Sequence, residues 1–228
     1  MSEMSNSKFK NVTHCIFDMD GLLIDTELLY TTVINRILCP YGNEFTWANK
    51  ATTMGFHTSE LVRYLIETFK LPLQPQELTD QLIVGYADVF PSSKLLPGVE
   101  TLLHHLCKHN IPIALATSSS ADSFALKTKH LTKIFDLFHH KVLGGSDPDV
   151  KQGKPSPDIF LVAAKRFSDT PDPLKCLVFE DAPNGVQAGI SAMVPDKNLP
   201  KKFTEQATLV INNLNEFKPE NFGLPKYD

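Results

Sequence analysis

The 228-residue sequence has no block of basic residues, no long apolar run and no closely spaced pair of cysteines. Its 22 lysines and arginines are outnumbered by 26 acidic residues, which disfavours a nucleic acid polymer as partner, because phosphate backbones bind concentrated positive charge. No apolar run approaches the roughly 20 residues that cross a bilayer, so no membrane partner is expected. The four cysteines form no CxxC motif, which disfavours a zinc or redox site.

The first eleven residues are rich in serine, asparagine and lysine and contain no apolar segment typical of a signal peptide. Apolar residues make up 42% of the chain and charged residues 21%, which is the balance of a folded globular protein. We therefore expect a cytoplasmic protein with one large domain, or with one domain that carries an insertion.

Short apolar segments that end in polar residues predict a parallel β-sheet. Strands are expected over residues 12–17, 111–116 and 176–179, with shorter ones at 140–143 and 208–211. Helical patterns alternate with them, which is typical of an α/β fold with a Rossmann-like parallel-sheet core. Because ligands of such sheets bind beyond the carboxyl ends of the strands, the residues that follow each strand are the candidates for function.

A long helical segment separates the first two predicted strands. About 90 residues lie between them, although one crossover of a parallel sheet needs only about 30. From residue 27 to 90 the apolar residues recur every three or four positions, which predicts a small helical bundle. The domains expected are therefore a sheet-containing core of residues 1–25 and 95–228, and an inserted all-helical cap domain of residues 26–94.

The first strand ends in Asp18, Met19 and Asp20, and Gly21 follows. Because side chains alternate along a strand, Asp18 and Asp20 lie on one side, and Gly21 allows the backbone to turn tightly. Two neighbouring carboxylates repel each other, and a Mg²⁺ ion, which prefers such hard oxygen ligands, relieves the repulsion. The alternative is an acidic turn or helix cap without a metal, since Asp and Gly are ordinary turn residues.

Hydroxyl groups and a lysine follow later elements. The second strand runs into Thr117 and Ser118 before a predicted helix, where hydroxyl groups and free backbone N–H groups can bind phosphate. Lys154 stands just ahead of another helix and is followed by two prolines that restrict it, so its ammonium group can neutralise a phosphate or a carboxylate. Taken singly, helix capping and a proline at the first helical position explain these residues as well.

A second acidic pair, Glu180 and Asp181, follows the third strand. Asp181 can complete a cation site, and Glu180 can hold a ligand or water from behind it. A helix-capping role for Asp181 is the alternative. Acid pair, hydroxyl, lysine and acid pair thus occur in order, each just beyond a strand or at a helix start, and this order favours a single site that combines them.

With these four motifs the sequence resembles the haloacid dehalogenase-like hydrolase superfamily from Val12 onward. Four stretches are similar to its pseudouridine 5′-phosphatase branch, and these are residues 17–23, 115–119, 153–160 and 176–186. The resemblance implies a Mg²⁺-dependent phosphatase that hydrolyses a small phosphate monoester, pseudouridine 5′-monophosphate or a similar nucleotide or sugar phosphate. A phosphomutase of the β-phosphoglucomutase type shares all four motifs and is an alternative.

The resemblance also implies a role for each motif residue. Asp18 attacks phosphorus and forms an aspartyl-phosphate, and Asp20 protonates the leaving oxygen and then activates water. Mg²⁺ is held by Asp18, the backbone carbonyl of Asp20, and Asp181. Lys154 stabilises the negative charge on Asp18. The phosphate group is bound by Thr117, Ser118 and Lys154.

Substrate choice is expected from residues 53–59 of the helical cap. Gly55 gives this loop freedom, and His57 offers a hydrogen bond to a sugar or base. The alternative for His57 is an exposed residue at a helix start. We expect a monomer that acts on a small phosphorylated metabolite.

The segment that follows Asp181 departs from the resemblance. Residues 185–195 leave room for little more than one helical turn, whereas a crossover with its helix usually takes at least about 10 to 12 residues. Such a shortening can displace the metal site or repack the last strands. A catalytically impaired relative that binds phosphorylated ligands or a protein partner is therefore the second hypothesis.

Overall fold

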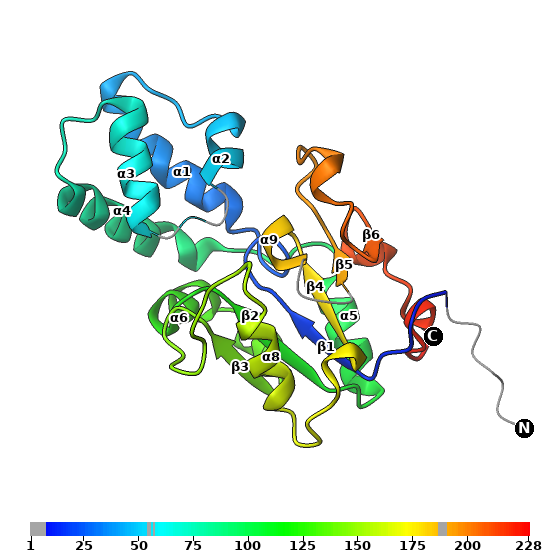
Figure 1. Cartoon of the computed structure of the whole chain (residues 1–228). Helices are drawn as coiled ribbons and strands as arrows, with labels where there is room; N and C mark the ends of the chain where they lie inside the picture. The colour runs from blue at the N-terminus through cyan, green and yellow to red at the C-terminus, as the bar shows by residue number, and fades with distance from the viewer. Residues whose placement is uncertain (1–7, 54–55, 57, 187–190) are drawn as a thin grey trace, which may run out of the picture. The chain divides into compact units, whose positions relative to one another are not determined.

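The computed structural model describes residues 8–53, 56, 58–186 and 191–228 (Figure 1). The chain divides into two compact units. The sheet unit comprises Met1–Ile24 and Leu95–Asp228, and the helical unit comprises Asp25–Lys94.

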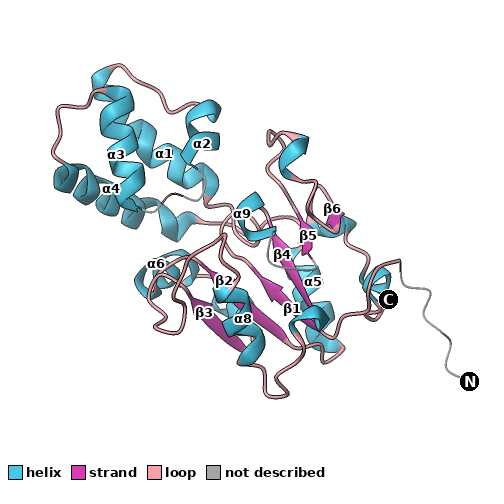
Figure 2. Ribbon diagram, viewed as in Figure 1, coloured by secondary structure: helices cyan, strands magenta, loops and turns pink. Residues whose placement is uncertain are grey.

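The sheet unit is built on parallel strands (Figure 2). The strands are β1 (His14–Phe17), β2 (Ile113–Thr117), β3 (His140–Leu143), β4 (Cys176–Glu180), β5 (Ser191–Met193) and β6 (Leu209–Val210). They form one six-stranded sheet in the order β3-β2-β1-β4-β5-β6. Every residue of β1, β2 and β4 is buried, which explains their continuous apolar sequences, since parallel strands are covered on both faces. The predicted α/β class with a parallel sheet is confirmed.

Helices cover both faces of this sheet. They are α5 (Val99–Lys108), α6 (Ala121–Thr128), α7 (Thr132–Phe135), α8 (Asp158–Lys165) and α9 (Pro183–Val186), with 3₁₀ turns at Pro173–Lys175, Lys201–Phe203, Leu214–Glu216 and Pro219–Phe222. Leu106 of α5 belongs to the same apolar cluster as Phe17, whereas Ala163 of α8 belongs to the cluster of Ile16. Because neighbouring residues of a strand point to opposite faces, α5 and α8 lie on opposite sides of β1.

Strand β5 is the one strand of the described sheet that the sequence does not predict. It has only three residues, too few to show the alternation that marks a strand. Val178 of β4 pairs with Ser191, and β6 continues the sheet from β5, both in parallel. The last strands therefore extend the sheet even though α9 has only four residues, and residues 187–190 of the short segment lie outside the described residues.

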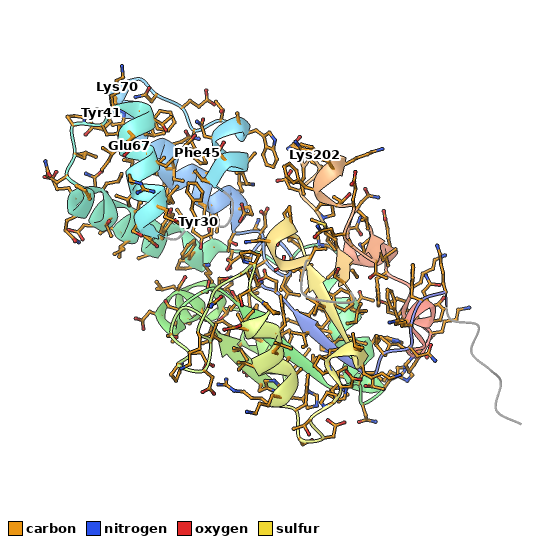
Figure 3. All side chains as sticks on the ribbon, viewed as in Figure 1. Tyr30, Tyr41, Phe45, Glu67, Lys70 and Lys202 are labelled. Atoms are coloured by element: carbon orange, nitrogen blue, oxygen red, sulfur yellow. The ribbon has the colours of Figure 1, made fainter. Side chains whose placement is uncertain are left out.

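The helical unit forms an apolar core of its own. Its elements are α1 (Glu27–Leu38), α2 (Trp47–Thr53), α3 (Thr58–Phe69) and α4 (Pro75–Val89), with 3₁₀ turns at Cys39–Tyr41 and Phe90–Ser92. Side chains of α1, α3 and α4 pack together with Phe45, which is labelled in Figure 3. The described residues of this unit contain helices and no strand, and none of the chain's described helices has the length and apolar character needed to cross a membrane.

Candidate active site

Asp18, Lys154 and Glu180 form a buried ion-pair network at the carboxyl edge of the sheet. Asp18 directly follows β1, and its backbone N–H donates to the carbonyl oxygen of Phe179 in β4 at 3.0 Å. Glu180 ends β4, and Lys154 comes from the loop before α8. The Nζ atom of Lys154 lies 2.5 Å from Asp18 Oδ1 and 2.5 Å from Glu180 Oε1, and none of the three side chains is more than 9% exposed. Three of the four sequence motifs therefore meet here.

Local backbone groups hold the Glu180 carboxylate in place. Its Oε2 atom accepts hydrogen bonds from the backbone N–H groups of Asp181 and Ala182, each at 2.9 Å. Gly185 of α9 passes so close that a Cβ atom at this position would lie 1.8 Å from Glu180 Oε1. The other oxygen, Oε1, bonds directly to Lys154. This contact goes beyond the role that the sequence predicts for Glu180, which is to hold a ligand or water from behind the cation site.

Burial and charge crowding change the acidity of the Asp18–Lys154 pair. Burial raises the pKa of Asp18 to about 7; Lys154 opposes this rise, and the negative charges of Glu180 and Asp20 add to it. Burial by itself lowers the pKa of Lys154, but Asp18 and Glu180 outweigh it and raise that pKa above its ordinary value. Lys154 is therefore charged at neutral pH, and a full negative charge on Asp18 calls for further positive charge nearby.

The residues around Asp18 fit a divalent cation. Asp18, Glu180 and Asp181 are all buried, and one carboxylate oxygen of each lies within 4.8 Å of the others. Such hard oxygen donors suit Mg²⁺. Burial is the main cause of the raised pKa of Asp18, and the neighbouring negative charges that add to it also favour a bound cation. The sequence predicts a ligand set in which the backbone carbonyl of Asp20 binds the cation and Glu180 supports the site from behind. This ligand set stays a prediction.

The Asp20 carboxylate has different partners. Its Oδ1 atom accepts a hydrogen bond from Lys127 Nζ at 2.7 Å, and its Oδ2 atom accepts one from Ser119 Oγ at 3.0 Å. Lys127 also donates to Ser119 Oγ at 2.9 Å. Lys127 belongs to none of the predicted motifs. Its spacing nevertheless places it on the inner face of α6 with Phe124 and Thr128.

The end of β2 contributes the hydroxyl groups that the sequence assigns to phosphate binding. Thr117 is buried, and its Oγ1 atom accepts a hydrogen bond from the backbone N–H of Ser119 at 3.1 Å, whereas Ser118 is exposed. The cap of α6 is Ser120, whose side chain accepts from the N–H of Ser123. Helix capping therefore falls to Ser120, and phosphate binding by Thr117 and Ser118 stays a prediction. Gly55 and His57, the predicted substrate-loop residues, lie outside the described residues.

The fold and this cluster define a class of protein: parallel-sheet α/β enzymes that carry a buried carboxylate, paired with a lysine, just after the first strand. A family model described as haloacid dehalogenase-like hydrolase matches residues 12–192. The chain belongs to this family.

Individual relatives carry more specific names. A protein of Drosophila melanogaster named as a probable pseudouridine-5′-phosphatase is 48% identical over 98% of this chain and 99% of its own length. A (DL)-glycerol-3-phosphatase 2 of Arabidopsis thaliana is 44% identical over 96% of this chain and 94% of its own. Among solved structures, a Thermotoga maritima protein described provisionally as a β-phosphoglucomutase has a TM-score of 0.72 and 28% identity, covering 90% of this chain and 96% of that one.

Proposed function

We propose that this hydrolase removes the phosphate group from a small nucleotide or sugar monophosphate, with Asp18 as nucleophile and Mg²⁺ as cofactor. The enzyme is a phosphoric monoester hydrolase. The observation that carries the proposal is Lys154, held 2.5 Å from both Asp18 and Glu180 beside three clustered carboxylates. A lysine there orients the nucleophile and offsets the charge of an incoming phosphate.

The reaction proceeds in two steps. In the first, an Asp18 oxygen attacks phosphorus, the ester P–O bond breaks, and Asp20 gives a proton to the leaving oxygen. In the second, water attacks phosphorus, gives a proton to Asp20, and the bond from phosphorus to Asp18 breaks. Thr117, Ser118 and Lys154 hold the phosphate oxygens through both steps. Asp18, the backbone carbonyl of Asp20, and Asp181 would hold Mg²⁺, which would supply positive charge that reduces the repulsion between Asp18 and the phosphate.

The first substrate to test is pseudouridine 5′-monophosphate, and the second is glycerol 3-phosphate. The names of the Drosophila and Arabidopsis relatives support them in that order, because both relatives match nearly the whole chain at 44% identity or more. We propose that the helical unit acts as a cap that selects the leaving group, with Gly55 and His57 on its substrate loop. The substrate class is thus a small phosphorylated metabolite.

The test is release of inorganic phosphate from these two substrates and from β-glucose 1-phosphate, with and without Mg²⁺. We expect Mg²⁺-dependent release from at least one of them, and its loss in Asp18→Asn. Asp136→Asn, which changes an exposed aspartate in the same way, is the matched control and should behave like the unmodified protein.

Other outcomes separate the alternatives. Absence of Mg²⁺-dependent release from every substrate supports a catalytically impaired relative that only binds ligands. Conversion of β-glucose 1-phosphate without phosphate release supports a mutase. Turnover that survives Asp18→Asn contradicts the nucleophilic role of Asp18.

A further inference from the structure

Lys127 is a lysine whose side chain has no exposed surface. It lies on α6, 107 residues from Asp20 in the sequence, and its Nζ atom donates to Asp20 Oδ1 and to Ser119 Oγ. Burial of an ammonium group costs free energy unless the group is paired and hydrogen-bonded. The groups that Lys127 bonds to therefore indicate its role.

Lys127, Asp20 and Ser119 form a triangle of hydrogen bonds. Lys127 holds Oδ1 of Asp20, Ser119 holds Oδ2, and Lys127 also holds the Ser119 hydroxyl. Rotation of the Asp20 carboxylate would break at least two of these bonds. The Asp20 side chain is nevertheless 20% exposed, so it remains accessible while its orientation is fixed.

A purely structural role accounts poorly for a charge at this position. Lys127 lies on the buried face of α6, next to Thr128 and near Leu131, where an apolar side chain of similar length would avoid the desolvation cost. Replacing buried ion pairs by apolar residues is often neutral or stabilising. The charge therefore points to a task at Asp20 rather than to stability of the helix.

We propose that Lys127 is a positioning residue that, together with Ser119, holds the Asp20 carboxyl group in one orientation for proton transfer. This inference rests on the proposed function, in which Asp20 is the acid and then the base. A lysine ammonium only donates, so Oδ1 stays an acceptor throughout. A serine hydroxyl can donate or accept, so Oδ2 is the oxygen that exchanges the proton.

Both steps of the reaction then balance. In the first, the proton on Oδ2 passes to the leaving ester oxygen as the P–O bond breaks and the bond from Asp18 to phosphorus forms. In the second, Oδ2 takes a proton from the attacking water as the bond from Asp18 to phosphorus breaks. Lys127 keeps its own protons in both steps and acts only through Asp20.

The variants that test this are Lys127→Met, which removes the charge at similar length, and Lys127→Arg, which keeps it. Lys129→Met, an exposed lysine at the end of the same helix, is the matched control. With an alkyl phosphate substrate we expect Lys127→Met to lower kcat about 10- to 100-fold with little change in KM, which is the usual effect of losing a residue that orients a site. Lys127→Arg should recover part of the loss, and Lys129→Met should show none.

A double-mutant comparison separates positioning from structure. If Lys127 acts through Asp20, Lys127→Met should have no further effect on kcat in an Asp20→Asn protein. A general loss of structure would lower kcat in both backgrounds by the same factor. Melting curves of every variant show whether it is folded, and Ser119→Ala, a smaller change with the same expected dependence on Asp20, serves where Lys127→Met does not fold.

p-Nitrophenyl phosphate provides a second readout, because its leaving group needs little help from an acid. In Lys127→Met, transfer of phosphate to Asp18 should persist while hydrolysis of the aspartyl-phosphate slows, so we expect a burst of p-nitrophenol and phosphoenzyme detectable by intact-mass spectrometry. Unchanged kcat in Lys127→Met, or an equal effect with and without Asp20, overturns the inference. Full activity of Asp20→Asn itself would instead contradict the proposed role of Asp20.

Discussion

The two carboxylate oxygens of Glu180 serve different partners. Oε1 accepts from Lys154, and Oε2 accepts from the backbone N–H groups of Asp181 and Ala182. Lys154 also donates to Asp18, so rotation of Glu180 would remove one of the two carboxylate contacts that hold the ammonium group in place. Gly185 lies against Oε1, so the missing side chain at this residue is part of the geometry of the site.

We predict that Gly185→Ala lowers kcat about 10- to 100-fold, as expected for disturbing a residue that orients a catalytic group. The new methyl group, 1.8 Å from the present position of Glu180 Oε1, forces that carboxylate to move. Steady-state kinetics on the best substrate provides the measurement. Glu180→Gln should reproduce part of the loss, and a Gly185→Ala protein with unchanged kcat would show that the position of Glu180 does not matter for turnover.

At the scale of elements, the start of α5 is packed against the 3₁₀ turn Leu214–Glu216. Gly98 begins the helix with φ of +89°, and a Cβ atom there would lie 2.3 Å from the backbone nitrogen of Asn215. Backbone atoms cannot move aside as a flexible side chain can. This contact joins a helix near the middle of the chain to its C-terminal segment, and it depends on the absence of a side chain.

We predict that Gly98→Ala destabilises the protein more than Gly42→Ala does. Gly42 also has a positive φ, of +70°, but nothing lies within 4 Å of a Cβ there, so its substitution costs only the backbone strain of about 1 to 2 kcal/mol. The clash at Gly98 should add about 1 to 3 kcal/mol. Urea unfolding followed by far-ultraviolet circular dichroism measures the loss of secondary structure in both units, and fluorescence of Trp47, the single tryptophan, follows the helical unit. Equal losses for the two variants would contradict the close contact.

At the scale of the whole molecule, the charge of the site is linked to folding. Burial raises the pKa of Asp18 to about 7, so the folded protein without a cation binds this proton more tightly than the unfolded chain, where the pKa is about 3.9. That contribution to stability is fully present below about pH 4 and is lost as the pH rises through 7. A cation bound at the carboxylates replaces the proton and removes the penalty.

We therefore predict that Mg²⁺ raises the melting temperature, and raises it more at pH 8 than at pH 6, because the proton on Asp18 competes with the cation at the lower pH. Mg²⁺ at 100 times its Kd would add about 2.7 kcal/mol. Differential scanning fluorimetry over a series of Mg²⁺ concentrations at both pH values measures the effect. Asp181→Asn should weaken it, whereas Asp136→Asn should not, and a melting temperature that Mg²⁺ leaves unchanged would contradict the cation site.

The class of fold and the residues that follow its strands could be predicted from the amino-acid pattern. Continuous apolar segments can be covered on both faces only in a parallel sheet, and the carboxyl ends of its strands then bring Asp18 and Glu180 to one edge, although they are far apart in the chain. The short strand β5 escaped prediction because three residues cannot display a period. Its place in the sheet is decided by pairing with β4.

The partner of each carboxylate, in contrast, depends on how the elements pack in three dimensions. Asp18 and Asp20 are both acidic and only two residues apart, yet one pairs with Lys154 and the other with Lys127 and Ser119. The two lysines come from different segments, and each is buried against a different aspartate. Both contacts join residues more than 100 positions apart, and no local sequence pattern specifies such a contact. The physical reason is that periodicity assigns a residue to a face of its own element, whereas the packing of elements sets the distances between charged atoms.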